Sequence, residues 1–193
     1  MSSLIRTEML RNKWELSELP DLKVGDCLAF ESTGWQKIVK LIGARSFHWG
    51  MIGGPLQDDS ISEGDYSIFD STSKGITAHL LSEYRARGMR VYRIRIEDDY
   101  HKELAPLLMK RYFYYGDQRY DWFGVLAVAT WLLLRKLGFN VEWWVHDSNR
   151  FWCLEFNELV WRDLGYPLVP ENEPPHPGNM ERSPALKCIW GTY

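Results

Sequence analysis

The 193-residue sequence has few cysteines, no long hydrophobic run and no block of basic residues. Cys27, Cys153 and Cys188 are an odd number without a Cys-x-x-Cys pair, which argues against a disulfide framework and favours a reducing compartment. The longest apolar run, Trp122 to Leu134, is shorter than the roughly 20 residues that span a bilayer. It therefore predicts a helix that is buried or that touches a membrane surface.

The first 20 residues also lack the uninterrupted apolar segment of a secretory signal, because charged residues such as Arg6, Glu8 and Arg11 interrupt them. We expect residues 1–20 to be a helical or irregular leader and the protein to be cytoplasmic, unless another route delivers it to a cell wall. The net charge is −3. Without a basic patch, nucleic acid is not an expected partner.

Several catalytic signatures are missing as well. The sequence has no Gly-x-Ser-x-Gly elbow, no phosphate-cradling glycine loop and no dinucleotide fingerprint. Cys153, His176 and Cys188 lack the paired short spacing of zinc ligands. We therefore expect no metal and no cofactor, which leaves side-chain chemistry alone.

A cysteine at the start of a predicted helix is the main candidate for that chemistry. Cys153 falls in the first turn of an amphipathic segment, residues 149–161, with polar residues at 147–149 that can cap it. First-turn N–H groups and the helix dipole favour a thiolate at such a position. A small buried core residue is the alternative interpretation of Cys153.

The remaining patterns predict one α+β domain over residues 21–193, with a small, mostly antiparallel sheet packed against helices. The expected strands are 26–31, 46–54, 66–71, 76–79 and 89–96. The expected helices are 35–42, 100–115, 122–137 and the one that begins near Cys153. Residues 167–177 are proline-rich, so this tail is expected to wrap rather than fold.

A histidine on the predicted strand 46–54 could serve as the base that a cysteine hydrolase needs. Alternation places His48, Gly50 and Ile52 on one face, and Gly50 leaves room beside the imidazole. A strand histidine is also often structural, and spacing does not show whether it meets Cys153. Three other histidines, His79, His101 and His146, are expected to face solvent.

Six segments resemble, in order, those of the circularly permuted NlpC-type papain-like proteins, the YiiX-like group. They cover about residues 21 to 190. The segments are Gly25–Phe30 (GDCLAF), Phe47–Gly54 (FHWGMIGG), Tyr66–Ser71 (YSIFDS), Gly116–Asp121 (GDQRYD), Cys153–Phe156 (CLEF) and Pro177–Pro184 (PGNMERSP). The resemblance implies a permuted papain-like fold.

The resemblance also implies roles for three residues. Cys153 would be the nucleophile, His48 the general base and then acid, and Asp70 the group that orients the imidazole. The sequence departs from the family pattern at Leu154, where the family has serine, and at Asp70, where a glutamate is common. These changes bear on the oxyanion hole and on the reach of the orienting acid.

Four further residues are candidates for binding substrate or supporting the site. Tyr120 could line the pocket or donate to a substrate carbonyl, although a packed tyrosine is the simpler interpretation. Glu155 would be a first-turn glutamate that the helix dipole favours, or, as the family motif implies, would hold a neighbouring loop. Trp49 and Trp152 are aromatic neighbours of the predicted histidine and cysteine.

The leading functional hypothesis is a cysteine-dependent amide hydrolase that works through an acyl-enzyme and acts on peptides or peptidoglycan-like peptides. One alternative is an acyltransferase or lipid-ester hydrolase, since lecithin:retinol acyltransferase-like proteins share the permuted core. Another is a catalytically silent binding module. Membrane contact is compatible with the sequence but not required, and the oligomeric state is not specified.

Overall fold

The computed structural model describes residues 13–32, 46–55, 65–72, 75–96, 98–115, 119–143 and 150–192. The predicted helix 35–42, the polar residues 147–149, His146 and the first half of the predicted Gly116–Asp121 loop lie outside these ranges. Within them, the five predicted strands and the three remaining predicted helices are present, with ends shifted by a few residues.

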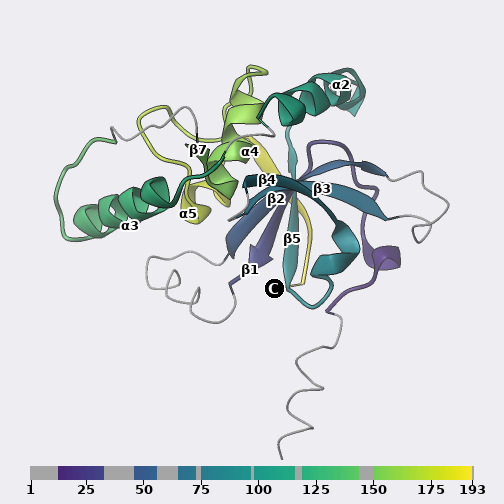
Figure 1. Ribbon diagram of the computed structural model, residues 1–193, viewed down its shortest axis with the longest axis horizontal. Coiled ribbons are helices and arrows are strands. Elements are labelled where there is room, and N and C mark those ends of the chain that lie inside the picture. Colours follow the sequence, from purple (N-terminus) through teal and green to yellow (C-terminus); the bar gives the residue numbers. More distant parts are fainter. Residues whose placement is uncertain are drawn as a thin grey trace, which may run out of the picture.

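The centre of the molecule is an open, antiparallel six-stranded sheet in the order β4-β3-β2-β1-β5-β8 (Figure 1). This arrangement confirms the α+β class. The strands are β1 (Cys27–Glu31), β2 (Ser46–Pro55), β3 (Tyr66–Thr72), β4 (Gly75–Leu80), β5 (Met89–Ile94) and β8 (Leu186–Gly191).

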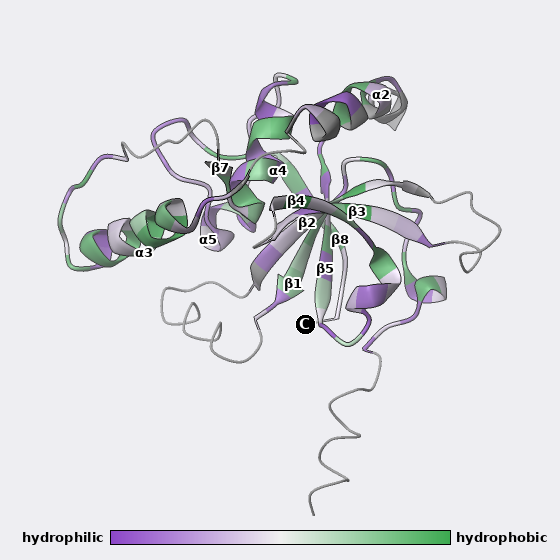
Figure 2. Ribbon diagram, viewed as in Figure 1, coloured by the Kyte–Doolittle hydropathy of each residue, from purple (hydrophilic) through white to green (hydrophobic). Residues whose placement is uncertain are grey.

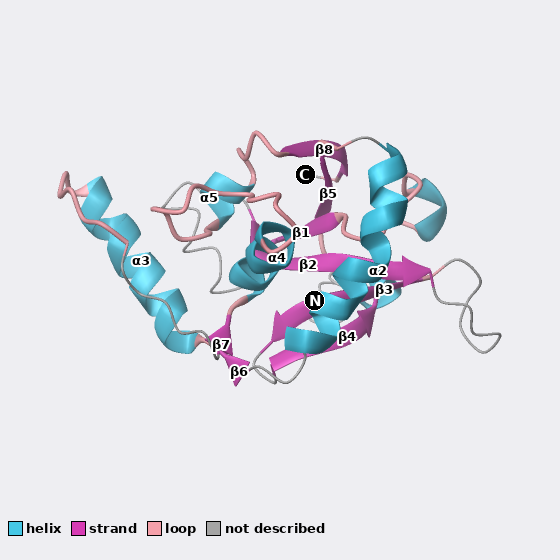
Figure 3. Cartoon of the chain, turned by 90° about the horizontal axis from the view of Figure 1, so that it is seen from above, coloured by secondary structure: helices cyan, strands magenta, loops and turns pink. Residues whose placement is uncertain are grey.

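The helices gather on one side of the sheet (Figure 3). In both ribbon views α4 lies centrally, α2 to one side and α3 and α5 to the other. The helices are α2 (Asp98–Tyr115), α3 (Trp122–Lys136), α4 (Cys153–Arg162) and α5 (Pro177–Met180), with short 3-10 turns η1 (Leu16–Glu18) and η3 (Leu81–Tyr84). None of the helices in the described ranges is both long enough and apolar enough to span a bilayer.

Three strands were not predicted from the sequence. Residues 167–176 contain no helix or strand, as was expected of the proline-rich tail. The residues that follow carry α5 and then β8, which pairs with the edge of β5. The other two, β6 (Arg119–Tyr120) and β7 (Arg150–Phe151), form a two-residue parallel pair just ahead of α3 and α4. Strands this short carry no periodic signal, and their pairing depends on tertiary contacts.

Both faces of the sheet are covered by hydrophobic cores, as the alternation of β2 requires. Trp49 and Met51 point into the core shared with α4, whereas Ile52 points into the opposite core. That second core includes Trp14, whose indole N–H donates to the Arg87 carbonyl oxygen at 2.9 Å. Residues 13–20 therefore pack onto the sheet as part of the domain.

The helix α4 is held against the beginning of β1 by a glycine contact. The Trp161 indole N–H donates to the Gly25 carbonyl oxygen at 3.3 Å. Gly25 has a positive φ of 91°, and a Cβ there would lie 2.6 Å from the Trp161 ring. Only glycine suits this backbone conformation and this close approach. The contact fixes α4, and Cys153 at its start, over the sheet.

Candidate active site

The nucleophile candidate Cys153 is the first residue of α4 and is only 3% exposed. The residue at the N-cap is Trp152, which makes no side-chain capping hydrogen bond, so the helix begins without the polar cap that the sequence suggested. A different contact fixes this end. The Ser71 hydroxyl donates to the Phe151 carbonyl oxygen at 2.7 Å, which ties the approach to Cys153 to the strand that carries Asp70.

The structure places His48 between Asp70 and Cys153. Its Nε2 lies 2.7 Å from Asp70 Oδ2, and the Cys153 side chain is near enough to raise the pKa of the imidazole. Because Nε2 is engaged by Asp70, Nδ1 is the nitrogen left for the thiol. Burial lowers the pKa of His48, but the hydrogen bonds and charges of Asp70 and Cys153 outweigh it and raise the pKa to about 9.

The register of β2 and β3 explains why Asp70 reaches the imidazole. Asp70 stands directly opposite Gly50, two residues from His48 on the same face, so the two side chains are diagonal neighbours. A Cβ at Gly50 would lie 2.7 Å from Ile68 Cγ2 and 3.5 Å from Asp70 Cβ. The space that Gly50 leaves is thus taken by side chains of β3, including Asp70.

Asp70 is fully buried and accepts more than one hydrogen bond. The Tyr84 hydroxyl donates to Oδ2 at 2.6 Å, and the Thr77 hydroxyl donates to Oδ1 at 3.4 Å. Burial raises the pKa of Asp70. The hydrogen bond and charge of His48, together with the hydrogen bond from the Tyr84 hydroxyl, outweigh burial, so the pKa is lowered overall. The carboxylate therefore stays charged beside a charged imidazole.

Tyr84 is a site residue that the sequence analysis missed. It belongs to η3 and stacks on Phe30, with ring centroids 4.5 Å apart, while Phe30 also stacks on His48 at 5.8 Å. Burial and the charge of Asp70 raise the pKa of Tyr84, so its phenol remains a donor. A tyrosine in a four-residue 3-10 turn carries no periodic signal that could have revealed this role.

The expectation that His79 faces solvent alone is wrong. Its Nε2 lies 2.8 Å from the Thr77 hydroxyl and 3.6 Å from Asp70 Oδ1, and its Nδ1 lies 3.4 Å from Glu83 Oε2. The pairing of β3 with β4 places Thr77 opposite Asp70 and His79 beside it. His79 is thus a second imidazole on the same buried carboxylate.

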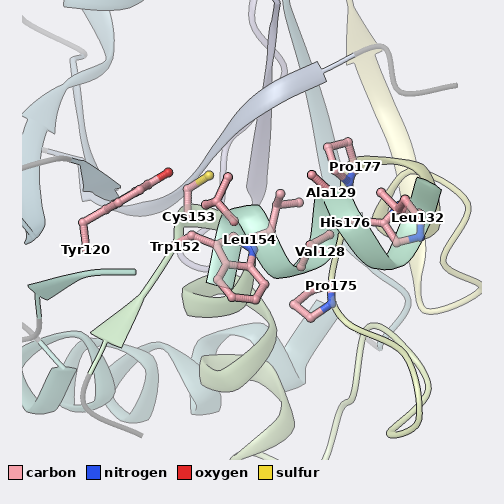
Figure 4. A pocket seen from close by; sticks show the side chains of 11 residues that line it. Tyr120, Val128, Ala129, Leu132, Trp152, Cys153, Leu154, Pro175, His176 and Pro177 are labelled. Carbon is pink, nitrogen blue, oxygen red and sulfur yellow. The ribbon is translucent and has the colours of Figure 1, made fainter. Parts of the chain in front are cut away.

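A mostly apolar pocket opens beside Cys153 (Figure 4). Its walls come from α3, from the beginning of α4 and from the tail. The lining residues are Tyr120, Val125, Val128, Ala129, Leu132, Trp152, Cys153, Leu154, Pro175, His176 and Pro177. A substrate that reaches the sulfur would therefore lie against hydrocarbon.

Tyr120 lines this pocket, and its hydroxyl points toward the Cys153 sulfur (Figure 4). Burial, followed by the charges of Cys153, Asp121 and Asp70, raises the pKa of Tyr120. The phenol therefore keeps its proton and can act as a hydrogen-bond donor. This position fits the donor role considered for Tyr120 as well as the packing role.

The other supporting candidates differ in position. Trp152 and Leu154 both line the pocket, so the residue that departs from the family pattern is part of the pocket wall. Trp49 is fully buried, and its indole N–H donates to the Ser46 hydroxyl at 2.8 Å, so it supports β2 and does not reach the pocket. Glu155 is buried in the first turn of α4.

His176 is another pocket residue that the sequence analysis did not assign to the site. Its Nδ1 accepts a hydrogen bond from the Gly178 backbone N–H at 3.1 Å. Burial, together with the charge of Arg182, lowers its pKa to about 4 despite Glu173. His176 is therefore neutral, with Nε2 protonated, at neutral pH.

Comparisons with known proteins show a shared fold. No protein-family model matches the sequence, and no curated protein is significantly similar to it. Among solved structures, the chain is similar to the crystal structure of the metalloprotein YiiX from Escherichia coli O157:H7, of a family named DUF1105. The TM-score is 0.59 and the identity 14%, and the match covers 88% of this chain and 97% of YiiX. The chain therefore has the overall fold of YiiX.

Proposed function

We propose that the protein is a cysteine-dependent amide hydrolase on a permuted papain-like fold. The proposal depends on one observation, the His48 imidazole hydrogen-bonded to Asp70 and close to the Cys153 thiol, which stands at the start of a helix and beside a pocket. A thiol, a protonated imidazole and a buried carboxylate in this order are the groups that thiol hydrolysis requires. YiiX contributes the likeness of fold and no residue role.

The reaction would use these groups in two stages. The Cys153 thiolate attacks the substrate carbonyl carbon, forming a C–S bond. When the tetrahedral intermediate collapses, the C–N bond breaks and His48 gives its proton to the leaving amine. Water, deprotonated by His48, then attacks the thioester, the C–S bond breaks and the acid leaves. Asp70 holds the imidazole in position throughout, and Tyr84 holds Asp70.

The negatively charged oxygen of the tetrahedral intermediate needs hydrogen-bond donors that stabilise it. We assign this role to the backbone N–H of Cys153, in the first turn of α4, and to the Tyr120 hydroxyl. In the described residues, no three His, Cys, Asp or Glu side chains are arranged to hold a metal ion. YiiX is described as a metalloprotein, but the described residues of this chain offer no such set of ligands, and the proposed steps use no metal.

The lining of the pocket favours one class of acyl group. Val125, Val128 and Leu132 present hydrocarbon to a substrate bound at Cys153, and charged groups of a peptidoglycan peptide would be desolvated against them. We therefore propose an apolar acyl portion on the carbonyl side. The same observation favours, as a second candidate, hydrolysis or transfer of a lipid acyl ester through the same thioester.

Thiol alkylation tests the proposal without knowledge of the substrate. In a Cys188→Ser background, which removes the exposed thiol, iodoacetamide should modify Cys153 at least roughly tenfold faster than Cys27, whose pKa is raised by burial. The N-octyl derivative of the reagent should increase this preference, because its chain can enter the pocket. His48→Ala should reduce it, and so should Asp70→Asn to a smaller degree.

A matched change elsewhere separates this from a general loss of structure. Asp163→Asn, at the far end of α4, should leave the rate at Cys153 unchanged. Equal alkylation of Cys153 and Cys27 in the folded protein, or a Cys153 rate indifferent to His48→Ala, would rule out the hydrolase. A faster reaction with iodoacetamide than with its octyl derivative would remove the apolar acyl group from the proposal.

A further inference from the structure

The outer side of α3 and the turn after it expose large apolar side chains. Among the residues that the structure describes, α2 is the other element that exposes such side chains. On α3 and its turn the exposed fractions run from 52% to 71%. We call these residues the α3 surface: Trp122, Phe123, Leu126, Leu133, Leu137 and Phe139. Figure 2 shows α3 coloured as hydrophobic over most of its length. Soluble domains rarely leave an apolar patch of this kind in water without a partner.

The exposed residues form a continuous stripe. Leu126, Thr130, Leu133 and Leu137 follow one another at spacings of four, three and four residues, which places them on one side of a helix. The polar member of the stripe is Thr130, and its hydroxyl donates to the Leu126 carbonyl oxygen at 2.9 Å. The hydroxyl is thus already bonded within the helix, so it does not break the apolar character of the stripe.

The charge of this segment has one sign. Between positions 122 and 141 the charged residues are Arg135 and Lys136, with no aspartate or glutamate. The Arg135 guanidinium lies over the Trp131 ring, 4.9 Å from its centroid, at the end of the helix. An apolar stripe ending in cations matches the acyl region and the anionic headgroups of a lipid surface.

The opposite side of α3 forms a wall of the pocket. Val125, Val128, Ala129 and Leu132 face Cys153, whereas the α3 surface faces outward. In both ribbon views α3 lies at the periphery of the molecule, away from the sheet (Figures 1 and 3). One helix therefore separates the pocket from the exposed apolar stripe.

From these observations we infer that the α3 surface docks onto a lipid bilayer that contains anionic lipids. Leu126, Leu133 and their neighbours would enter the upper acyl region, and Arg135 and Lys136 would lie among the headgroups. Docking would hold the pocket one helix away from the lipid surface, which gives the α3 surface a role in the proposed function; that link rests on the hydrolase, but docking itself does not.

Vesicle co-sedimentation of the full chain tests the inference. The protein should sediment with phosphatidylcholine vesicles that contain phosphatidylglycerol, and less with pure phosphatidylcholine. The double variant Leu126→Glu, Leu133→Glu should lower the affinity for these vesicles by roughly tenfold or more, because the apolar side chains that enter the bilayer are lost. Arg135→Gln with Lys136→Gln should abolish the preference for anionic vesicles.

The controls use a residue of the same type on another helix. Leu107 on α2 is also exposed, so Leu107→Glu should leave vesicle binding unchanged. Circular dichroism would show that all variants keep their helices. Cys153→Ala should bind vesicles like the unmodified chain, so a failure of the hydrolase proposal would be seen in alkylation and not in sedimentation.

Three results would overturn the inference. The first is no sedimentation of the unmodified chain with anionic vesicles, and the second is an equal loss of binding in Leu107→Glu. The third is a dimer in light scattering that Leu133→Glu dissociates, with no vesicle binding by either form. That last result would make the α3 surface an interface between two copies of this chain.

Discussion

The position of His48 between an acid and a thiol decides its charge. Burial alone would remove the proton from its imidazole, but Asp70 and Cys153 stabilise the charged form more strongly. Asp70 can do this because it is itself held as a carboxylate, with the Tyr84 hydroxyl on the same oxygen that faces His48. The proton that the leaving amine needs is thus already on the imidazole at neutral pH.

We predict that this balance can be read directly from the imidazole resonances. In NMR titrations, His48 should change protonation near pH 9. Asp70→Asn should lower this midpoint toward 6.5 or below, because burial continues to lower the pKa when the carboxylate is removed. His176, with a pKa of about 4, should be unaffected and serves as an internal reference.

The matched variant for this titration is Asp163→Asn. Asp163 lies at the end of α4, roughly 15 Å along the helix from Cys153. Its removal should leave the His48 midpoint in place. A midpoint near 6.5 in the unmodified protein would contradict the arrangement of charges around His48.

Among the elements, α3 and α4 meet at a close contact beside the candidate nucleophile. Asp121 caps α3 by accepting from the Gly124 backbone N–H at 2.9 Å. A Cβ at Gly124 would lie 2.2 Å from both Asp121 Oδ2 and Trp152 Cζ3. The absence of a side chain at Gly124 therefore lets Trp152, the residue before Cys153, pack against the first turn of α3.

This contact reverses the usual effect of a glycine-to-alanine change in a helix. Such a change ordinarily stabilises a helix by about 1 kcal/mol. Gly124→Ala should instead lower the free energy of unfolding by about 1 to 3 kcal/mol, because Trp152 or Asp121 must shift. Urea denaturation measures the effect. Thr130→Ala, on the exposed side of α3, should change it by less than about 0.5 kcal/mol, and a Gly124→Ala protein more stable than the original would disprove the contact.

Elements with a periodic pattern could be predicted from the sequence. Five of the strands, including β2 and β5, and the helices α2, α3 and α4 follow from alternating or helical spacing. The strand β8 could not, because its extended form depends on pairing with β5. The N-cap of α4 is Trp152, which makes no capping hydrogen bond, and that end is fixed by the Ser71 hydroxyl on the Phe151 carbonyl oxygen and by the packing of Trp152 against α3.

At the scale of the whole molecule, the site is a product of strand order and register. Cys153 and His48 come from opposite halves of the chain, and only the tertiary fold brings them together. Local sequence patterns contain no information on such a contact, so only the resemblance suggested the pair. Tyr84 and His79 were missed for the same reason, because the pairing of β3 with β4 and the turn after it bring them to Asp70.

The charge pair also links the stability of the whole domain to pH. A group whose pKa is raised on folding stabilises the folded state below its unfolded pKa, and that contribution is lost as the pH rises through the folded pKa. For His48 this stabilisation should be lost between about pH 6.5 and about pH 9. It should amount to roughly 3 kcal/mol, part of it due to Cys153. The lowered pKa of Asp70 acts in the opposite direction. Its contribution to stability is present above about pH 3.8 and is lost in more acidic solution.

Asp70→Asn should therefore destabilise the protein most between about pH 4 and 6.5, where both charges are present in the folded state. The difference in the free energy of unfolding between the variant and the original should shrink steadily from pH 6.5 to 9. Just above pH 9 part of the difference in the free energy of unfolding should remain, because Tyr84 and Thr77 lose part of their hydrogen bonding in the variant. Urea denaturation across this range measures the difference, with Asp163→Asn as the control. A difference that stays constant from pH 5 to 9 would mean that His48 carries no charge in the folded protein, because in this range the titration of that imidazole links the loss of Asp70 to pH.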